Sequence, residues 1–309
     1  GANNTANGSG ALFSNTTGSS NIANGFKALY SNTTGYGNTA VGSTTLFSNT
    51  TGAYNTAIGG RALYSNTTGY YNTANGHNAL RSNTTGSNNT ANGMNSLYSN
   101  TTGATNTANG FRALYSNTTG NNNTANGLSS LYSNTTGSNN VAIGQGSLAA
   151  NTTGYSNTAN GEGASSFNTT GYYNTANGSY ALRFNTTGFS NTSIGVRSLE
   201  NNTTGSFNTG VGSHTLHSNT TGSYNTAIGD GADVGSNNLT NATAIGNGAT
   251  VSASNKIRLG NTNVTSIEGQ VAWTNASDRR LKKDITNTKY GLETILKLVP
   301  VDYLLKSNN

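Results

Sequence analysis

The sequence predicts an all-β repetitive fold, a β-roll or β-solenoid built from seventeen-residue coils. Three observations predict it. The triplet Asn-Thr-Thr recurs at one constant spacing without an insertion, glycines keep fixed places in each repeat, and no repeat has the length or apolar spacing of a helix. The thirteen triplets start at Asn15, Asn32, Asn49, Asn66, Asn83, Asn100, Asn117, Asn134, Asn151, Asn168, Asn185, Asn202 and Asn219. Such regular spacing indicates that each repeat stacks directly on its neighbour.

The composition excludes several classes of protein. Charged residues make up 8% of the 309 residues, and large apolar side chains are too few for an ordinary globular core. Disordered chains are poor in aromatic residues, whereas 16 Tyr and 8 Phe recur here at fixed places. Cysteine is absent, which excludes disulfides and zinc thiolates, and no stretch is apolar enough to insert in a membrane.

The positive charge lies almost entirely in the carboxyl-terminal part of the chain. Residues 1–255 contain 6 Lys or Arg and 4 Asp or Glu, whereas residues 256–309 contain the other 9 and 5. The repeats are therefore nearly neutral. A groove for nucleic acid, which needs clustered Lys and Arg, is not expected.

One repeat, NTAIGGRALYSNTTGYY from Asn55 to Tyr71, shows the elements of a coil. Thr56, Ala57 and Ile58 are expected to form one short strand, and residues 62–65 a second. The glycines at 59 and 69 supply the turns between them. Coils stacked at about 4.8 Å predict a rod of roughly 60 Å for the thirteen repeats.

A leucine column supplies the core. Its members are Leu12, Leu29, Leu46, Leu63, Leu80, Leu97, Leu114, Leu131, Leu148, Leu182, Leu199 and Leu216. Ser165 interrupts the column, and Phe167 is expected to fill the gap. One Leu and small Ala residues per coil make a thin core, so we expect the chain to bury more surface in an oligomer, preferably a trimer.

The fourth position of the repeat alternates between apolar and polar residues. It is Val or Ile in some copies, such as Ile58, but Asn in others, such as Asn75. Two interpretations are open. The Asn side chains form a hydrogen-bonded ladder inside the core, or the Asn takes a left-handed conformation in an Asn-Gly turn.

The phrases NTAIG, NVAIG and NATAIG resemble coils in the heads of trimeric autotransporter adhesins. The resemblance covers about residues 1–255. It implies a trimeric, left-handed parallel β-roll, and in that family the heads bind host surfaces.

The repeat pattern and the composition of the sequence change after the repeats. Residues 1–234 form the repeat region, residues 235–276 read as closing coils and a β transition segment, and residues 277–309 form a third part. In this last part Leu292, Ile295, Leu296 and Val299 are spaced as one face of a helix that ends before Pro300.

The third part resembles the start of the endosialidase-type intramolecular chaperone domain of phage tail spikes and fibres. The matching residues are Ser277, Asp278, Arg280, Leu281, Lys282 and Asp284, followed by the helix and LVPVDYLL. The resemblance implies chaperone-assisted trimerisation and a single self-cleavage between Ala276 and Ser277. Ser277 would then be the nucleophile and Lys282 its base. The alternative is that Ser277 only caps a charged helix.

The triplets themselves allow three interpretations. Each Asn-Thr-Thr is an acceptor pattern for N-glycosylation at the thirteen Asn residues given above. The same triplet also makes a turn through local hydrogen bonds. A third hypothesis is that Thr16, Thr17 and their repeats order water as an ice-binding array.

If the triplets carry sugars, the tyrosines at variable positions of the repeat would line the neighbouring edge and cover or bind glycans. These are Tyr36, Tyr54, Tyr70, Tyr71, Tyr155, Tyr172, Tyr173 and Tyr224.

Little else in the repeats suggests chemistry. His77, His214 and His217 have no acidic or Cys cluster beside them, so we expect no metal site and no cofactor. The repeats contain only Glu162, Glu200, Asp230 and Asp233 as acids, which gives no support to a glycoside hydrolase.

These patterns together predict an extracellular structural protein. The first hypothesis is the distal rod of a trimeric phage tail fibre or spike used for surface attachment, with a cell-surface glycan or protein as receptor. The alternative is a bacterial surface adhesin or an extracellular filament. An autoprotease alone would leave the repeats without a function.

Overall fold

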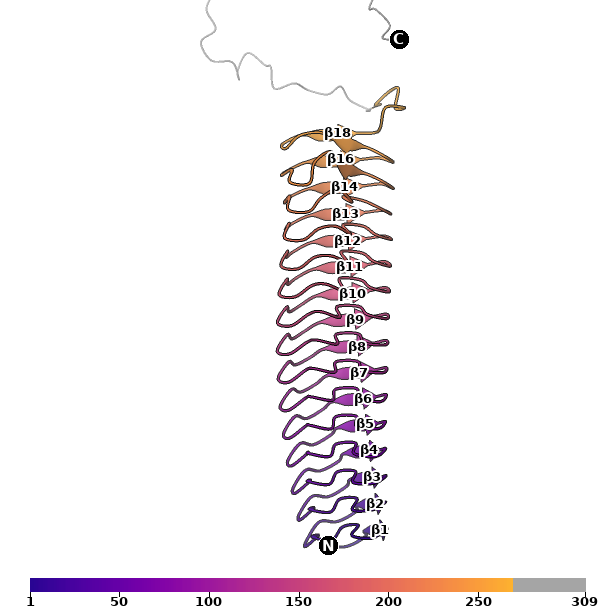
Figure 1. Cartoon of the computed structure of the whole chain (residues 1–309), viewed down its shortest axis with the longest axis vertical. Helices are drawn as coiled ribbons and strands as arrows, with labels where there is room; N and C mark the ends of the chain where they lie inside the picture. The colour runs from indigo at the N-terminus through magenta and orange to yellow at the C-terminus, as the bar shows by residue number, and fades with distance from the viewer. Residues whose placement is uncertain (269–309) are drawn as a thin grey trace, which may run out of the picture. The chain divides into compact units, whose positions relative to one another are not determined.

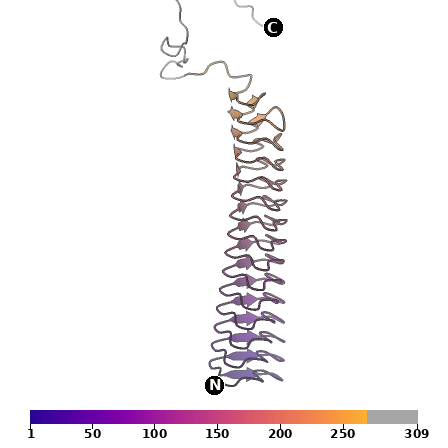
Figure 2. The ribbon, with the colours of Figure 1, turned by 90° about the vertical axis from the view of Figure 1, so that its left-hand side faces the viewer.

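The computed structural model describes residues 1–268, and residues 1–263 form one compact unit. In that unit each repeat makes one coil, and the coils stack into a straight parallel β-solenoid (Figures 1 and 2). The predicted all-β solenoid is confirmed. The predicted helix before Pro300 lies outside the described residues.

Sixteen strands form one parallel sheet along the rod. They are β1 Thr5–Asn7, β2 Ile22–Asn24, β3 Thr39–Val41, β4 Thr56–Ile58, β5 Thr73–Asn75, β6 Thr90–Asn92, β7 Thr107–Asn109, β8 Thr124–Asn126, β9 Val141–Ile143, β10 Thr158–Asn160, β11 Thr175–Asn177, β12 Thr192–Ile194, β13 Thr209–Val211, β14 Thr226–Ile228, β16 Thr243–Ile245 and β18 Ile257–Leu259. A separate two-stranded sheet pairs β15 Asp233–Val234 with β17 Thr250–Val251.

The strands pair in register, so equivalent residues of successive repeats lie side by side. In β4 and β5, for example, Thr56 pairs with Thr73 and Ala57 with Ala74. The middle residue of such a strand is buried and its two neighbours point outward, as the period of two in a strand requires. The outer face of the sheet therefore carries two columns of side chains. One column consists mostly of Thr, and the other is the mixed fourth position of the repeat.

The predicted second strand at residues 62–65 is wrong for the regular coils. This segment is a turn, because Arg61 and Leu63 have φ angles of 60° and 50°, in the left-handed region that a strand cannot contain. Its backbone still bonds to the next coil, since Leu63 N donates to Ala79 O at 3.0 Å. A strand forms at this place only in the last coils, as β15 and β17.

The core is as thin as the sequence predicts. Each regular coil buries the central strand residue, usually Ala, and the Leu of the leucine column, both without solvent exposure, and in many coils a second Ala lies beside them. Where Ser165 replaces Leu, the Ser is itself buried. Phe167 does not fill the gap: it is 46% exposed and stacks on Phe184.

Two ladders of buried Asn complete the interior. In the first, the Asn of the triplet bonds to the preceding coil: Asn66 Nδ2 donates to Asn49 Oδ1 at 2.8 Å and to Gly69 O at 3.0 Å. In the second, Asn72 Nδ2 donates to Asn55 Oδ1 at 3.1 Å and to Gly86 O at 2.9 Å. These amides satisfy carbonyls that would otherwise be buried without partners.

Neither interpretation of the mixed fourth position is correct. Asn75 is exposed and belongs to a strand, and the left-handed residue is the following Gly76, with φ of 135°. Some exposed Asn residues do bond along the column, as Asn92 Nδ2 donates to Asn109 Oδ1 at 2.9 Å. This column therefore lies on the surface and does not contribute to the core.

Replacing one Asn of the first ladder should destabilise the rod. Asn66→Ala removes two donated bonds and the one that Asn66 Oδ1 accepts from Asn83. We expect a loss of about 2–4 kcal/mol in the free energy of unfolding, because buried partners lose their bonds. The exposed Asn75→Ala is the matched control and should change the free energy by less than about 0.5 kcal/mol. Equal losses in denaturant unfolding would contradict the structural role of the ladder.

The Gly after the triplet is required because a side chain would not fit there, and not because its backbone takes a left-handed conformation. The φ of Gly69 lies outside the left-handed region, but a Cβ there would overlap Asn66 Oδ1 and the Gly86 carbonyl oxygen. At Gly146 the φ is 64° and a Cβ meets nothing within 4 Å. We expect Gly69→Ala to lower the melting temperature clearly more than Gly146→Ala, whose cost is the left-handed strain of about 1–2 kcal/mol. The reverse order in thermal unfolding would refute this packing account.

Candidate functional site

The first candidate surface is a ladder of aromatic rings on the edge formed by the Tyr column. Phe13, Tyr30, Phe47 and Tyr64 stack with centroids 5.1–5.2 Å apart, and Tyr98, Tyr115 and Tyr132 continue the stack at 5.1–5.2 Å. Arg81 replaces one ring and places its guanidinium 5.9 Å from Tyr64 and 5.4 Å from Tyr98. Backbone stacking alone brings these rings to aromatic contact distance.

The tyrosines predicted to line a neighbouring edge form two exposed clusters. One contains Tyr36, Tyr54, Tyr70 and Tyr71 around a hollow of about 230 Å³, and Tyr54 stacks on Tyr71 at 5.1 Å. The other contains Tyr155, Tyr172, Tyr173, Phe189, Phe207 and Tyr224. Both clusters are aromatic platforms on the surface of the rod.

Three tyrosines have a raised pKa. The proximity of Tyr36 raises the pKa of Tyr54, and partial loss of water raises the pKa of Tyr155. The hydrogen bond that Tyr180 donates to Glu162 at 3.0 Å raises the pKa of Tyr180. Each of these three phenols therefore stays neutral at physiological pH.

The aromatic ladder ends after Tyr132, and two adjoining hollows open there. The first, of about 370 Å³, lies where Ala149 and Ser166 stand in the Tyr column. The second, of about 530 Å³, follows it, and Phe167 lines both. The lining residues of the two are Arg112, Ser129, Tyr132, Ser133, Ala149, Ala150, Ser166 and Phe167, then Phe184, Thr186, Asn201, Thr203, His217, Ser218 and Thr220. We call these two hollows the edge groove.

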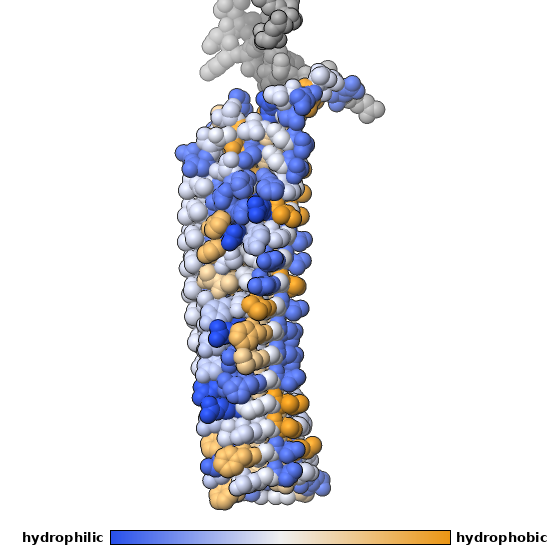
Figure 3. All heavy atoms as spheres, turned by 45° about the vertical axis from the view of Figure 1, so that its right-hand side comes forward, coloured by the Kyte–Doolittle hydropathy of each residue, from blue (hydrophilic) through white to orange (hydrophobic). Residues whose placement is uncertain are grey.

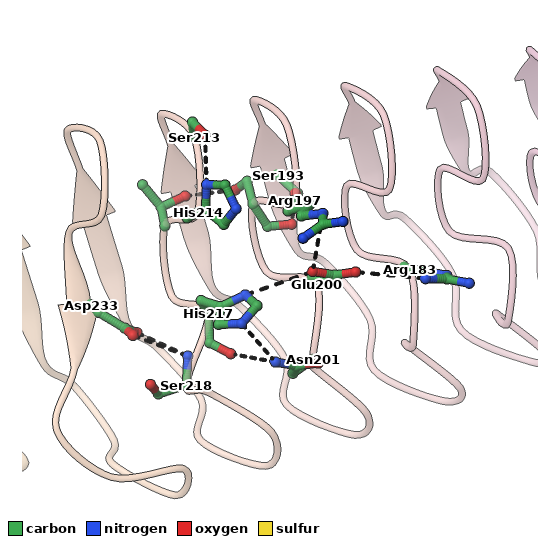
Figure 4. A network of polar contacts seen from close by, with 12 residues as sticks. Arg183, Ser193, Arg197, Glu200, Asn201, Ser213, His214, His217, Ser218 and Asp233 are labelled. Carbon is green, nitrogen blue, oxygen red and sulfur yellow. Dashed lines mark hydrogen bonds and ion pairs between the residues drawn. The ribbon is translucent and has the colours of Figure 1, made fainter.

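A polar network lies beside the second hollow (Figure 4). Its centre is Glu200, only 6% exposed, whose carboxylate oxygens lie 3.8 Å from Arg183 Nη1 and 3.9 Å from Arg197 Nε. Two cations thus lie beside a carboxylate that has little contact with water, and the three groups together carry one net positive charge. The Arg183 guanidinium also lies 4.9 Å from the Phe184 ring.

The network fixes the orientation of His217. Its Nδ1 lies 3.8 Å from Glu200 Oε2, its Nε2 lies 3.3 Å from Asn201 Nδ2, and Asn201 Nδ2 donates to the His217 carbonyl at 2.9 Å. If Asn201 donates to Nε2, the imidazole hydrogen is on Nδ1, which is buried and makes no hydrogen bond in the described residues. The network can therefore hold the side chains of the groove wall in place.

Neither this network nor the edge groove was predicted from the sequence. In the sequence Glu200 and His217 stand as isolated residues, and nothing there pairs them with Arg183. The available signal was the departure of the Tyr and Ser columns from their consensus between residues 149 and 218. His214 and His217 are close, with ring centroids 5.8 Å apart, but no group of three metal-ligating side chains occurs within residues 1–268.

The predicted glycosylation residues lie in the first Asn ladder. Apart from the half-buried Asn15 in the first coil, all of them, from Asn32 to Asn219, are buried. Both amide hydrogens of such an Asn are donated inside the stack, as described for Asn66. Glycosylation therefore stays a prediction that the folded ladder disfavours, and the turn interpretation of the triplet agrees with the observed bonds.

The two Thr residues of the triplet differ in their surroundings. The first bonds to the next coil, as Thr67 Oγ1 donates to Thr84 O at 3.0 Å, whereas the second, such as Thr68, is exposed. A single exposed Thr column follows this edge, and the ice-binding hypothesis stays a prediction. Ser277 and Lys282, the predicted self-cleavage residues, lie outside the described residues.

The fold and these surfaces define a repetitive structural β-solenoid with aromatic platforms along its edges. Residues 277–309 match the model of the family described as chaperone of endosialidase, so the predicted resemblance of this segment is confirmed. No curated protein sequence matches the chain. In the part of the chain that the structure describes, no helix has the length and hydropathy needed to cross a membrane.

The Glu200 network should contribute to stability through charge. Glu200→Gln leaves Arg183 and Arg197 without a carboxylate, and we expect a loss of about 1 kcal/mol or less because both cations are partly exposed. The exposed Glu162→Gln, which keeps a hydrogen-bond acceptor for Tyr180, is the control. The difference between the two variants in denaturant unfolding should shrink in 1 M NaCl. A difference that is unchanged by salt would exclude an electrostatic origin.

Proposed function

We propose that this chain forms the rod of a trimeric fibre of the phage tail fibre or spike type, used for attachment to a cell surface. The observation that supports this function most directly is the order of its parts. A long, uniform β-solenoid is followed by a segment that matches the chaperone of endosialidase family. A stiff extended rod is the mechanical part of a fibre, and the chaperone segment accounts for its assembly.

Stiffness follows from the bonds between coils. Within the seventeen-residue repeats, each coil bonds to the next through its strand, through the turn after it and through both Asn ladders. Bending the rod would stretch all of these bonds on one side at once. The rod therefore resists bending and can carry a force applied at one end to the other.

The outward face of the sheet supports trimerisation. Ile194, Val211, Ile228, Ile245 and Leu259 occupy directly paired outward positions of β12, β13, β14, β16 and β18. Three of them, Ile194, Ile228 and Ile245, are 39–42% exposed in the single chain. Figure 3 shows apolar side chains interspersed with hydrophilic ones along the rod. We propose that this apolar run is the place where three chains first associate, because it is nearest in sequence to the chaperone segment.

The proposed processing step is one self-cleavage after assembly. Lys282, as a neutral amine, removes the proton of the Ser277 hydroxyl, and Ser277 Oγ attacks the carbonyl carbon of Ala276. The peptide bond is exchanged for an ester, and the Ser277 nitrogen takes up the proton from Lys282 and leaves as a free amine. Water then hydrolyses the ester and restores the Ser277 hydroxyl on the released segment.

A bacterial surface adhesin or extracellular filament is the second candidate. The NTAIG-type coils favour it, since such coils resemble adhesin heads. Both candidates place the protein outside the cell and give it a glycan or protein receptor. They differ in the role of residues 277–309, which an adhesin does not need for assembly.

Native and denaturing mass spectrometry of the complete gene product tests the proposal. We expect a trimer of chains that end at Ala276, each with the mass of the unmodified polypeptide. Ser277→Ala should leave a trimer of uncut chains, whereas Ile228→Asp should reduce trimer formation because it places a charge in the apolar run.

The matched control for Ile228→Asp is Thr68→Asp, at an exposed position away from the sheet face. Monomeric wild-type chains would refute the fibre proposal. Trimers that stay uncut in the wild type would refute the cleavage step alone, and chains heavier by hexose-sized steps would favour a glycosylated filament.

A further inference from the structure

We infer that the edge groove binds a linear, uncharged polysaccharide lying along the rod. The groove runs from the coil of Tyr132 to the coil of His217, which are five repeats apart. At about 4.8 Å per coil this is roughly 24 Å, long enough for several sugars. The inference rests on the attachment role proposed above and names the class of ligand that this surface recognises.

Aromatic rings supply the stacking surfaces. Tyr132 ends the ladder at the first hollow. Phe167 lines both hollows and stacks at 5.3 Å on Phe184, which lines the second. The electron-rich face of such a ring attracts the C–H face of a pyranose.

Polar groups that bind hydroxyls follow the same path. Thr186, Thr203 and Thr220 recur in successive coils, and each donates its hydroxyl hydrogen to the next coil, which leaves its oxygen able to accept. In the described part of the chain no donor bonds to Asn201 Oδ1, which gives a further acceptor. Ligand sites commonly combine apolar walls with a few such placed polar groups.

The charges argue against nucleic acids and acidic polymers. Arg112 is the one residue lining the groove with a permanent charge. The nearby network of Glu200, Arg183 and Arg197 carries one net positive charge. Together with Arg112 this falls short of the clustered Lys and Arg that hold a polyanion.

The backbone argues against an extended peptide. A peptide that adds as a strand needs free N–H and C=O groups. Along the groove these groups already bond between coils: Ser133 N donates to Ala149 O, Ala150 N to Ser166 O, and Phe167 N to Arg183 O, at 2.9–3.0 Å. The side chains alone are left for recognition, which suits a polyhydroxylated chain.

The repeat itself provides a variant that fills the first hollow of the edge groove without disturbing the fold. Tyr is the usual residue where Ala149 stands, and Ala149→Tyr would extend the ladder from Tyr132 into the first hollow. Arg81→Tyr makes the same kind of change at the other interruption of the ladder, between Tyr64 and Tyr98, outside the groove. The two variants therefore form a matched pair.

The experiment measures binding of hexasaccharides by isothermal titration calorimetry to the assembled full-length protein. The probes are cellohexaose, laminarihexaose, mannohexaose and chitohexaose, with an alginate hexamer as the acidic comparison. We expect at least one uncharged probe to bind in the micromolar to millimolar range. Ala149→Tyr and Phe184→Ala should each weaken binding by about tenfold or more, while Arg81→Tyr leaves it unchanged.

Several outcomes would overturn the inference. They are no binding by any uncharged probe at millimolar concentration, stronger binding of the alginate hexamer, or equal effects of Ala149→Tyr and Arg81→Tyr. The oligomeric state and thermal unfolding of each variant, measured on the same samples, separate loss of binding from loss of fold. A stable trimer that binds no sugar would refute the groove and leave the fibre proposal intact.

Discussion

Each coil of this rod stacks in register on neighbouring coils of nearly the same sequence. Because Thr56 lies beside Thr73 and Ala57 beside Ala74, every side chain has its own equivalent as its axial neighbour. A residue that suits this arrangement must pack and bond with a copy of itself. Asn does so through an amide that both donates and accepts, and aromatic rings do so by stacking. The length of the repeat is fixed because one extra residue would move every later column out of line.

The interior shows how a chain with few large apolar residues still forms a well-packed core. Leu63 and its neighbours fill the space that a small coil encloses, and the Asn ladders on either side bond to carbonyls that the turns leave unpaired. Such polar ladders add specificity of register, because a shift along the rod would leave buried amides without partners. The cost in conformational strain is the left-handed Leu of each coil.

Surface columns are free to vary because stacking constrains only the interior. The outward fourth position changes between Asn, Val and Ile, and its apolar members are contiguous near the carboxyl-terminal end of the rod, from Ile194 to Leu259. The Tyr column departs from its consensus at Ala149, Ser166 and Glu200, and there the edge groove and the Glu200 network appear. In a repeat protein, departures from the consensus that do not harm the core mark the surfaces where function has been added.

The repeat length, the all-β class, the strand at residues such as Thr56–Ile58 and the thin Leu-Ala core could all be predicted from the sequence, because each depends on a local pattern repeated thirteen times. The structure was needed to show which Asn columns are buried, that residues 62–65 form a left-handed turn, and that the mixed column faces outward. Burial of a polar residue depends on partners one full repeat away along the chain, and the amino-acid type alone does not reveal them. The same holds for the edge groove, whose hollows and polar neighbours come together only when successive coils stack.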